Sequence, residues 1–282
     1  MPIGTPILES LSKGKLYVVA TPIGNLEDIT LRALRILKEA DLIACEDTRQ
    51  SGKLLSHYGI TTSTISYHDH NEASRTAELI ARLESGSTVA LITDAGTPLV
   101  SDPGYRLVTA AVAAGITVVP IPGANAAMGA LAAAGLPTDE FRFCGFLPPK
   151  SGQRRKALEE LQSETCTLVF YEAPHRILET LEDIESVYGP RPVVVARELT
   201  KLHEEFLRGP AAEVRKTLAD RPSVKGEITL LIGKGEHIAD TTPIPEAVAA
   251  LEAAGVPRMD AIKQVARDRG LSKRDVYREI AG

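Results

Sequence analysis

The sequence predicts an α/β protein with two α/β domains and a small helical C-terminal appendage. Short apolar runs rich in β-branched residues recur as far as Ile232, as is typical of strands buried on both faces of a sheet. In the first domain, segments with helical spacing of apolar residues separate these runs, which favours a largely parallel sheet with right-handed crossovers. From about Asp240 only Pro-flanked helical patterns remain.

The first domain is expected over residues 15–135, after a flexible lead of residues 1–14 that is rich in Pro and Gly. It opens with an almost wholly apolar strand, and Thr30 or Asp28 suits the N-cap of the helix that follows. Gly115 ends its last predicted helix. The expected strands are 15–20, 42–45, 88–93 and 116–121, and the expected helices are 31–40, 72–83 and 105–114.

The second domain is expected over residues 136–236 and the helical tail over residues 237–282. The same alternation of apolar runs and helical spacing continues in the second domain. Its expected strands are 141–146, 167–171, 192–196 and 226–232, with helices at 156–163 and 175–188. In the tail the helical patterns cover 245–254, 258–269 and 273–280.

Composition excludes several classes of protein. Of the 282 residues 44% are hydrophobic and 24% charged, which suits a globular chain and not a disordered one. No apolar run approaches about 18 residues, and no apolar core follows the N-terminus, so we expect neither a membrane span nor a secretion signal. Cys45, Cys144 and Cys166 form no CxxC pair and indicate reduced thiols in a cytoplasmic protein. The net charge of −5 argues against a surface that binds nucleic acid everywhere.

Three loops at predicted strand ends combine Gly with Pro: residues 21–25, 94–104 and 120–127. Gly lets a ligand approach the backbone closely, and Pro fixes the direction of the chain. Ligands of open α/β sheets bind at the carboxyl ends of the strands, where such loops converge. None of the loops matches GxGxxG or GxxxxGK[ST], which disfavours a dinucleotide or a nucleoside triphosphate.

Several of these segments occur in a recognisable order. The succession TPIGNLEDIT, ACEDTR, HNE, DAGTPLVSDPG, PIPGANA, GFLP, FYEAPHRI, ARELTK and KGEITLLI resembles the tetrapyrrole-methylase superfamily of S-adenosylmethionine enzymes. Within it, the chain is similar over about residues 13–235 to the bacterial branch that methylates a cytidine 2′-hydroxyl of 16S ribosomal RNA. The resemblance implies two α/β domains with the donor cleft between them, and a homodimer.

The resemblance also implies which residues bind S-adenosylmethionine. They are Pro22, Ala95, Gly96, Thr97, Val100, Asn125, Ala126, Tyr171 and Thr200. Converging amides and short side chains suit a zwitterionic sulfonium ligand. Tetrapyrrole-modifying relatives often carry Gly-Gly-Asp-Pro where this chain has Ala95-Gly-Thr-Pro98, so an acid-to-donor contact does not transfer to Thr97. The acid stands earlier, at Asp94, where it would otherwise cap a turn.

Methyl transfer to a ribose hydroxyl benefits from a base that takes the proton. Glu46 and Asp47 follow a strand and are the first candidates, although acids also suit an ordinary helix N-terminus. Glu72 is a third candidate, and Asn71 beside it is expected to contact substrate. Arg49 and Lys53 would bind neighbouring phosphates. His68 and His70 lack a third ligand close by, so we expect no metal.

RNA contacts are also expected farther along the chain. Arg154 and Arg155 belong to a basic segment that we expect to be exposed. Arg176 and Lys201 would either contact phosphates or pair with nearby acids. Between Arg258 and Gly282 seven basic residues face four acids, an excess of 7 − 4 = 3 positive charges, which suits an RNA contact or a solvated helix face.

The resemblance therefore implies an S-adenosylmethionine-dependent 2′-O-methyltransferase acting on a cytidine of 16S ribosomal RNA in the small ribosomal subunit. The expected enzyme is a cytoplasmic homodimer with no membrane contact. One alternative is a methyltransferase of the same fold that acts on a tetrapyrrole or another small molecule. A second is a non-catalytic RNA-binding protein of ribosome assembly, which would not bind the methyl donor.

Overall fold

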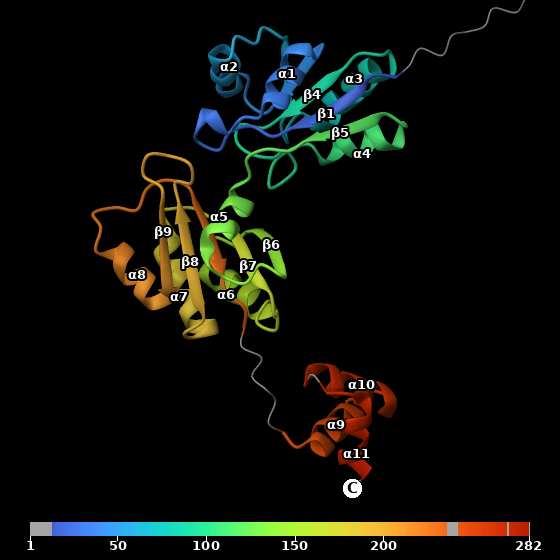
Figure 1. Cartoon of the computed structure of the whole chain (residues 1–282), viewed down its shortest axis with the longest axis vertical. Helices are drawn as coiled ribbons and strands as arrows, with labels where there is room; N and C mark the ends of the chain where they lie inside the picture. The colour runs from blue at the N-terminus through green and yellow to red at the C-terminus, as the bar shows by residue number, and fades with distance from the viewer. Residues whose placement is uncertain (1–12, 236–241, 270, 282) are drawn as a thin grey trace, which may run out of the picture. The chain divides into compact units, whose positions relative to one another are not determined.

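The computed structural model describes residues 13–235, 242–269 and 271–281 (Figure 1). Residues up to Gly235 form one compact unit, and the residues beyond form a second. Most of the lead predicted for residues 1–14 lies outside the described residues. No helix of the described ranges is long and apolar enough to cross a membrane.

The first sheet of the larger unit is parallel throughout, in the order β3-β2-β4-β1-β5. Its strands are β1 (Lys15–Val19), β2 (Leu42–Cys45), β3 (Thr64–Ser66), β4 (Val89–Ile92) and β5 (Thr117–Ile121). Its helices are α1 (Leu31–Glu39), α2 (Thr48–His57), α3 (Glu72–Glu84) and α4 (Tyr105–Ala113), and a short 3-10 helix covers Leu26–Asp28. The parallel sheet is confirmed; β3 and α2 were not predicted.

Helices cover both faces of this sheet, which explains the continuous apolar runs. Every residue of β2 and β4 is buried. Ile43 and Ile92 pack with side chains of α1 and α2, whereas Leu42 and Leu91 pack with α3 and α4 on the opposite face. The loops that follow β1, β2, β4 and β5 therefore leave the same edge of the sheet.

The second sheet has the order β6-β7-β10-β8-β9 and is mixed. Its strands are β6 (Phe141–Phe146), β7 (Thr167–Glu172), β8 (Pro192–Arg197), β9 (Glu205–Pro210) and β10 (Ile228–Ile232). β6 and β7 run parallel, but β10 pairs antiparallel with β7 and β8, and β9 pairs antiparallel with β8. The parallel pattern of the first sheet does not extend to the second, because β9, which was not predicted, folds straight back on β8.

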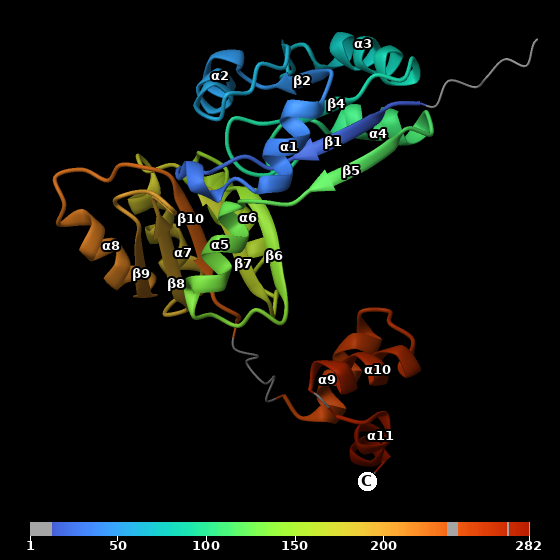
Figure 2. The same ribbon diagram turned by 45° about the horizontal axis from the view of Figure 1, so that its top comes forward.

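Four helices accompany this sheet: α5 (Ala126–Ala134), α6 (Ser151–Glu160), α7 (Ile177–Tyr188) and α8 (Ala211–Ala219). α5 packs on one face through Ala130 and Leu131, and α6, α7 and α8 pack on the other (Figure 2). α5 directly follows β5 and its loop, so one helix leads from the first sheet into the second. Both sheets lie in one compact unit, and the division into two domains near residue 135 stays a prediction.

The smaller unit consists of α9 (Ile244–Ala253), α10 (Arg258–Asp268) and α11 (Lys273–Ala281). Val248, Ile262, Val265 and Val276 are buried between these helices. The three helices predicted after Asp240 are therefore confirmed. Their shared apolar core explains how so short a segment packs as a unit.

Candidate methyl-donor site

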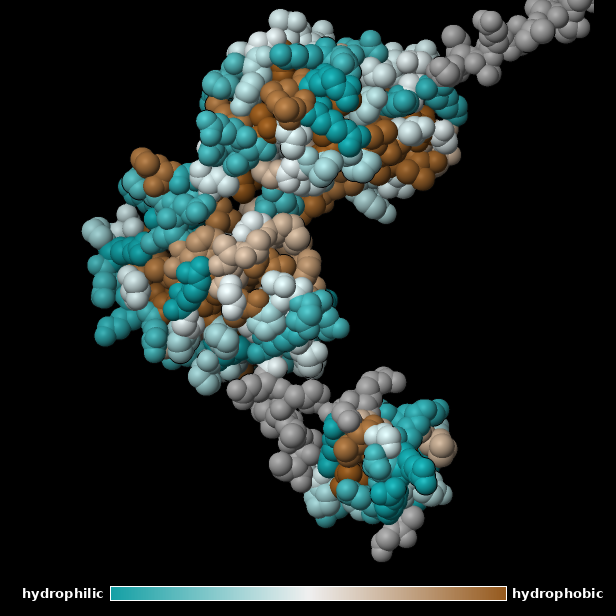
Figure 3. All heavy atoms as spheres, viewed as in Figure 1, coloured by the Kyte–Doolittle hydropathy of each residue, from teal (hydrophilic) through white to brown (hydrophobic). Residues whose placement is uncertain are grey.

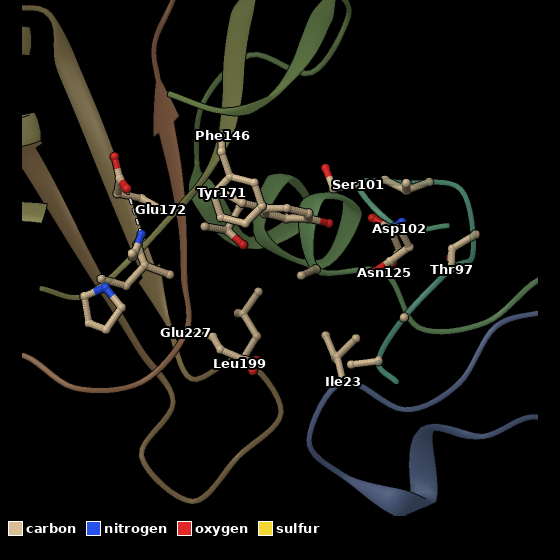
Figure 4. Close-up of a pocket in the computed structure, with 18 residues that line it drawn as sticks. Ile23, Thr97, Ser101, Asp102, Asn125, Phe146, Tyr171, Glu172, Leu199 and Glu227 are labelled. Carbon is tan, nitrogen blue, oxygen red and sulfur yellow. Dashed lines mark hydrogen bonds between the residues drawn. The ribbon is translucent and has the colours of Figure 1, made fainter. Parts of the chain in front are cut away.

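A cavity of about 360 Å³ lies at the carboxyl ends of the first sheet and against β7 and β10 of the second (Figure 4). Its lining from the first sheet and the start of α5 consists of Ile23, Ala95, Gly96, Thr97, Val100, Ser101, Asp102, Asn125 and Ala126. Its lining from the second sheet consists of Phe146, Tyr171, Glu172, Ala173, Pro174, Leu199, Glu227, Ile228 and Thr229. This volume lies in the range of small-molecule sites.

The structure brings together all of the predicted donor residues except two. Ala95, Gly96, Thr97, Val100, Asn125, Ala126 and Tyr171 all line the cavity. Pro22 is buried and does not line the cavity, whereas its neighbour Ile23 does. Thr200 follows the lining residue Leu199.

Backbone contacts hold the three Gly-Pro loops in one place. Thr21 N donates to Gly96 O at 2.8 Å, and Gly96 N donates to Thr21 O at 3.1 Å. Thr97 Oγ1 donates to Ala124 O at 3.2 Å, which ties the second loop to the third. Gly96 has a φ of 89°, a conformation in which a side chain would be strained. The backbone of the loop 94–104 is thus held in place by hydrogen bonds to the loops on either side of it.

The N-terminus of α5 opens at the cavity. Asn125 caps the helix, since its Oδ1 accepts a hydrogen bond from Met128 N at 3.0 Å. Asn125 and Ala126 both line the cavity. The amide groups of a first helical turn carry partial positive charge, so this end suits a carboxylate.

Aromatic rings form the opposite wall. The Tyr171 ring contacts Phe143 and Phe146 edge to face, with centroid distances of 5.0 and 5.7 Å. Burial raises the pKa of Tyr171, while a hydrogen bond with the backbone of Ala127 acts in the opposite sense. Such a wall offers a flat apolar surface for a ring such as adenine.

Thr200 gives an independent indication of a polar ligand. Its Oγ1 is buried and has no hydrogen-bond partner among the described residues. Its backbone has a φ of 67°, and its N donates to Glu204 Oε2 at 2.6 Å. Buried hydroxyl groups are normally hydrogen-bonded, so the unpartnered hydroxyl of Thr200, next in sequence to the lining residue Leu199, is available to a ligand. The residues present therefore fit a donor with both polar groups and an aromatic base.

Acidic side chains gather beside the three Gly-Pro loops. Thr93 Oγ1 donates to Glu46 Oε2 at 2.9 Å, and Asp47 N donates to Asp94 Oδ1 at 3.2 Å. Burial raises the pKa of Asp94, assisted by the charges of Glu46 and Asp47. Asp102, which sequence reasoning missed, lines the cavity itself. Its position in the loop 94–104, only two residues before Gly104, was the signal that could have found it.

The three predicted proton acceptors do not line the cavity. Asp47 caps α2 by accepting from Arg49 N at 2.8 Å, and it also pairs with the Arg49 guanidinium at 2.7 Å. Hydrogen bonds from Arg49 lower the pKa of Asp47 to about 2. Glu72 pairs with Arg106 at 2.5 Å.

Two of the predicted substrate contacts beside these acids are also hydrogen-bonded within the chain. Lys53 Nζ donates to Gln50 Oε1 at 2.7 Å. The Asn71 side chain accepts from His68 N at 2.9 Å and donates to Ser66 O at 3.2 Å. The Asn71 amide thereby stabilises the loop of residues 66–71.

Two further predicted phosphate contacts, Arg176 and Lys201, form ion pairs. Arg176 pairs with the buried Glu172, and Lys201 Nζ lies 2.9 Å from Glu198 and 3.1 Å from Glu227. Of the two alternatives left open for these cations, pairing with acids is the one that the structure shows.

The expectation that the basic segment is exposed holds for Arg155 but is wrong for Arg154. α6 begins five residues earlier than predicted and turns Arg154 inward, where its Nε donates to Asp183 Oδ2 at 2.6 Å. Arg155 lies on the outside and donates to Ser186 Oγ at 3.0 Å.

Comparison with known proteins identifies the class. The chain matches the family of tetrapyrrole (corrin/porphyrin) methylases over residues 15–215, and it belongs to that family. A relative from Halalkalibacterium halodurans named ribosomal RNA small subunit methyltransferase I is 52% identical, over 94% of this chain and 94% of its own. A relative of the same name from Haemophilus influenzae is 49% identical, over 94% of this chain and 95% of its own.

Solved structures share the fold. A uroporphyrin-III C-methyltransferase from Thermus thermophilus, complexed with S-adenosylhomocysteine, has a TM-score of 0.55 and 19% identity, covering 78% of this chain and 97% of that one. A diphthine synthase has a TM-score of 0.59 and 15% identity, covering 78% of this chain and 90% of that one. At these identities the likeness concerns the fold alone.

Proposed function

We propose that the chain transfers the methyl group of S-adenosylmethionine to the ribose 2′-hydroxyl of a cytidine in 16S ribosomal RNA. The observation that carries the proposal is that the three Gly-Pro loops meet at one cavity. This cavity also has an aromatic wall and a helix N-terminus. Two relatives that match nearly the whole chain are named as ribosomal RNA small subunit methyltransferases, which supports RNA over a tetrapyrrole as substrate.

In this proposal each wall of the cavity holds a different part of the donor. The start of α5, at Asn125 and Ala126, holds the amino-acid end, and Tyr171 with Phe146 holds the adenine. Thr200 offers its unpartnered hydroxyl to the adenosine. When bound, S-adenosylmethionine supplies a methyl group on a positively charged sulfur. The chain's contribution is to hold the ribose oxygen in line with that methyl group and to exclude water.

The acids around Asp94 and Asp102 repel phosphates, so the cations that hold RNA must lie outside the cavity. Arg49, 88% exposed, stands at the start of α2 beside this edge, and Arg155 stands on the outer surface of α6. Arg49 can exchange its exposed ion pair with Asp47 for a phosphate at low cost, because exposed ion pairs contribute little to stability.

The smaller unit adds a basic surface with an exposed aromatic ring. Met259 and Tyr277 are 56% and 55% exposed, and together with Ile262 they line a shallow hollow between α10 and α11. Its other lining residues are the cations Lys273, Arg274 and Arg278. The face of this unit seen in Figure 3 is mostly hydrophilic. Cations for phosphates and a ring for base stacking suit single-stranded RNA.

The proposal extends to the setting of the reaction. The substrate is the RNA as presented by the small ribosomal subunit, and the enzyme works as a cytoplasmic homodimer. Reduced cysteines suit that compartment: Cys45, Cys144 and Cys166 are all free thiols.

A transfer assay with methyl-labelled donor tests the proposal. Small ribosomal subunits that lack the modification, the naked RNA and a tetrapyrrole precursor are offered in parallel, and donor affinity is measured by calorimetry. Label in 16S RNA supports the proposal. Label in the tetrapyrrole alone would select the small-molecule methyltransferase, and absence of donor binding would overturn both enzyme assignments.

A further inference from the structure

Three carboxylates line the cavity, and two of them are already neutralised. Glu172 is fully buried, pairs with Arg176 and accepts a hydrogen bond from Thr180 Oγ1 at 2.8 Å. Glu227 lies 3.1 Å from Lys201 Nζ. Asp102 differs, because none of the ion pairs found among the described residues includes it. It is therefore the lining carboxylate with its charge available to a substrate.

The surroundings of Asp102 come from four parts of the fold. Glu46 follows β2, Asp69 follows β3, Asp94 shares the loop after β4, and each places a negative charge near it. The negative charge of Asp102 also helps to raise the pKa of the Tyr171 hydroxyl on β7. Burial, and then these like charges, raise the pKa of Asp102 to about 6. A hydrogen bond with Thr93 acts in the opposite direction and lowers this pKa. Such a carboxylate is ionised at neutral pH yet more basic than an ordinary aspartate.

The loop around Asp102 is held in a strained shape. Leu99 and Ser101 have φ angles of 73° and 64°, and Gly104 has 135°. A Cβ on Gly104 would lie 2.9 Å from Leu91 Cδ2, so the loop packs tightly on β4. Figure 4 shows Asp102 beside Asn125 and Ser101, facing the cavity opposite Tyr171. A strained conformation that packing enforces is common where a side chain must keep one position for function.

We propose that Asp102 is a catalytic residue, the base that accepts the proton of the ribose 2′-hydroxyl. The proposal rests on the proposed function. The 2′-oxygen lone pair forms the new bond to the methyl carbon, the carbon–sulfur bond breaks with its electrons on sulfur, and the hydroxyl proton passes to the Asp102 carboxylate. The carboxylate then returns the proton to solvent.

The test compares Asp102→Asn with the wild type and with Asp220→Asn, an exposed aspartate at the end of α8. Full-length proteins act on small ribosomal subunits at saturating donor between pH 5 and 9, and calorimetry gives the donor Kd. We expect kcat of Asp102→Asn to fall by about 10²- to 10⁴-fold with the donor Kd changed less than threefold. The wild-type rate should decline below about pH 6 as Asp102 protonates.

The Glu46→Gln variant supplies a second measurement, the pH at which the rate declines. A purely structural role of Asp102 would leave this pH unchanged. Removing this neighbouring negative charge should lower the pH at which the rate declines. The proposal is overturned if Asp102→Asn keeps a kcat within threefold of the wild type, or if its loss is all in donor affinity. An inactive wild type that binds donor would instead count against the proposed function.

Discussion

The side chain of Lys201 lies directly over Gly24, so that a Cβ on Gly24 would be 2.4 Å from Lys201 Cγ. Gly24 belongs to the loop after β1 and Lys201 to the loop after β8, so this contact joins the two sheets. Lys201 cannot simply move away, because its Nζ pairs with Glu198 and Glu227. Ile23, next to Gly24, and Leu199, two residues before Lys201, both line the cavity.

Gly24→Ala should therefore weaken donor binding by about tenfold. The methyl group would displace Lys201, and a φ of 149° is strained for any L side chain, at a cost of about 1–3 kcal/mol. Calorimetry with S-adenosylmethionine measures the affinity. Gly52→Ala is the matched control, because a Cβ there meets nothing within 4 Å. Equal donor affinity in the two variants would refute the role of this contact.

Tyr171→Ala should raise the donor Kd by about 10- to 100-fold, because it removes the central ring of the aromatic wall. Tyr171→Phe should keep most of the affinity if the ring is what matters. Tyr105→Ala, which truncates a tyrosine 74% exposed on α4, is the control and should bind donor normally. A Kd for Tyr171→Ala within threefold of the wild type would place the adenine elsewhere.

Arg154→Ala should destabilise the protein by about 3–5 kcal/mol, because it leaves the buried Asp183 without its cation. Arg155→Ala, on the exposed side of the same helix, should change stability by about 0.5 kcal/mol or less. Urea unfolding of the two variants measures the difference. Comparable stabilities would show that the Arg154–Asp183 pair has no structural role.

Asp102→Asn should make the protein more stable than the wild type at pH 8, by on the order of 1 kcal/mol. Burial and like charges hold the folded pKa of Asp102 at about 6, above its ordinary value of 3.8, so the ionised form opposes folding. The wild type regains stability as pH falls through 6, and the difference should vanish near pH 4. A difference in the melting temperature that stays constant between pH 8 and pH 4 would argue against this origin.

Reversing two charges of the smaller unit, Lys273→Glu with Arg274→Glu, should weaken binding to small ribosomal subunits by about tenfold or more. The salt dependence of binding should become shallower by about the number of lost phosphate contacts. Filter binding at several salt concentrations measures both effects. Lys216→Glu, on the exposed side of α8, is the control, and an equal loss there would mean that only net charge matters.

The buried strands could be predicted from sequence because their pattern is local. β2 and β4 are buried at every position, so each reads as a continuous apolar run. β9, from Glu205 to Pro210, is partly exposed along its length and contains Gly209, so nothing in its pattern marks a strand. Its pairing with β8 supplies the hydrogen bonds, and together with the antiparallel pairings of β10 it makes the second sheet mixed.

The meeting of the three Gly-Pro loops at one cavity could likewise be predicted from their positions at strand ends, whereas the ion pairs and pKa shifts of individual side chains could not. In the sequence nothing distinguishes Arg154 from an exposed cation, because its partner Asp183 is 29 residues away. Burial, and then the charges of acids such as Glu46 and Asp69 that follow other strands, likewise raise the pKa of Asp102. Such environments arise only when distant segments meet.

Nucleoside analysis of the methylated RNA tests the central claim most directly. Unmodified small ribosomal subunits are treated with the protein and labelled donor, the 16S RNA is digested to nucleosides, and the labelled product is identified by mass spectrometry. The account predicts a single labelled product, cytidine with the methyl group on its ribose 2′-oxygen. Label on a base, on another nucleoside, or in no RNA at all would contradict it.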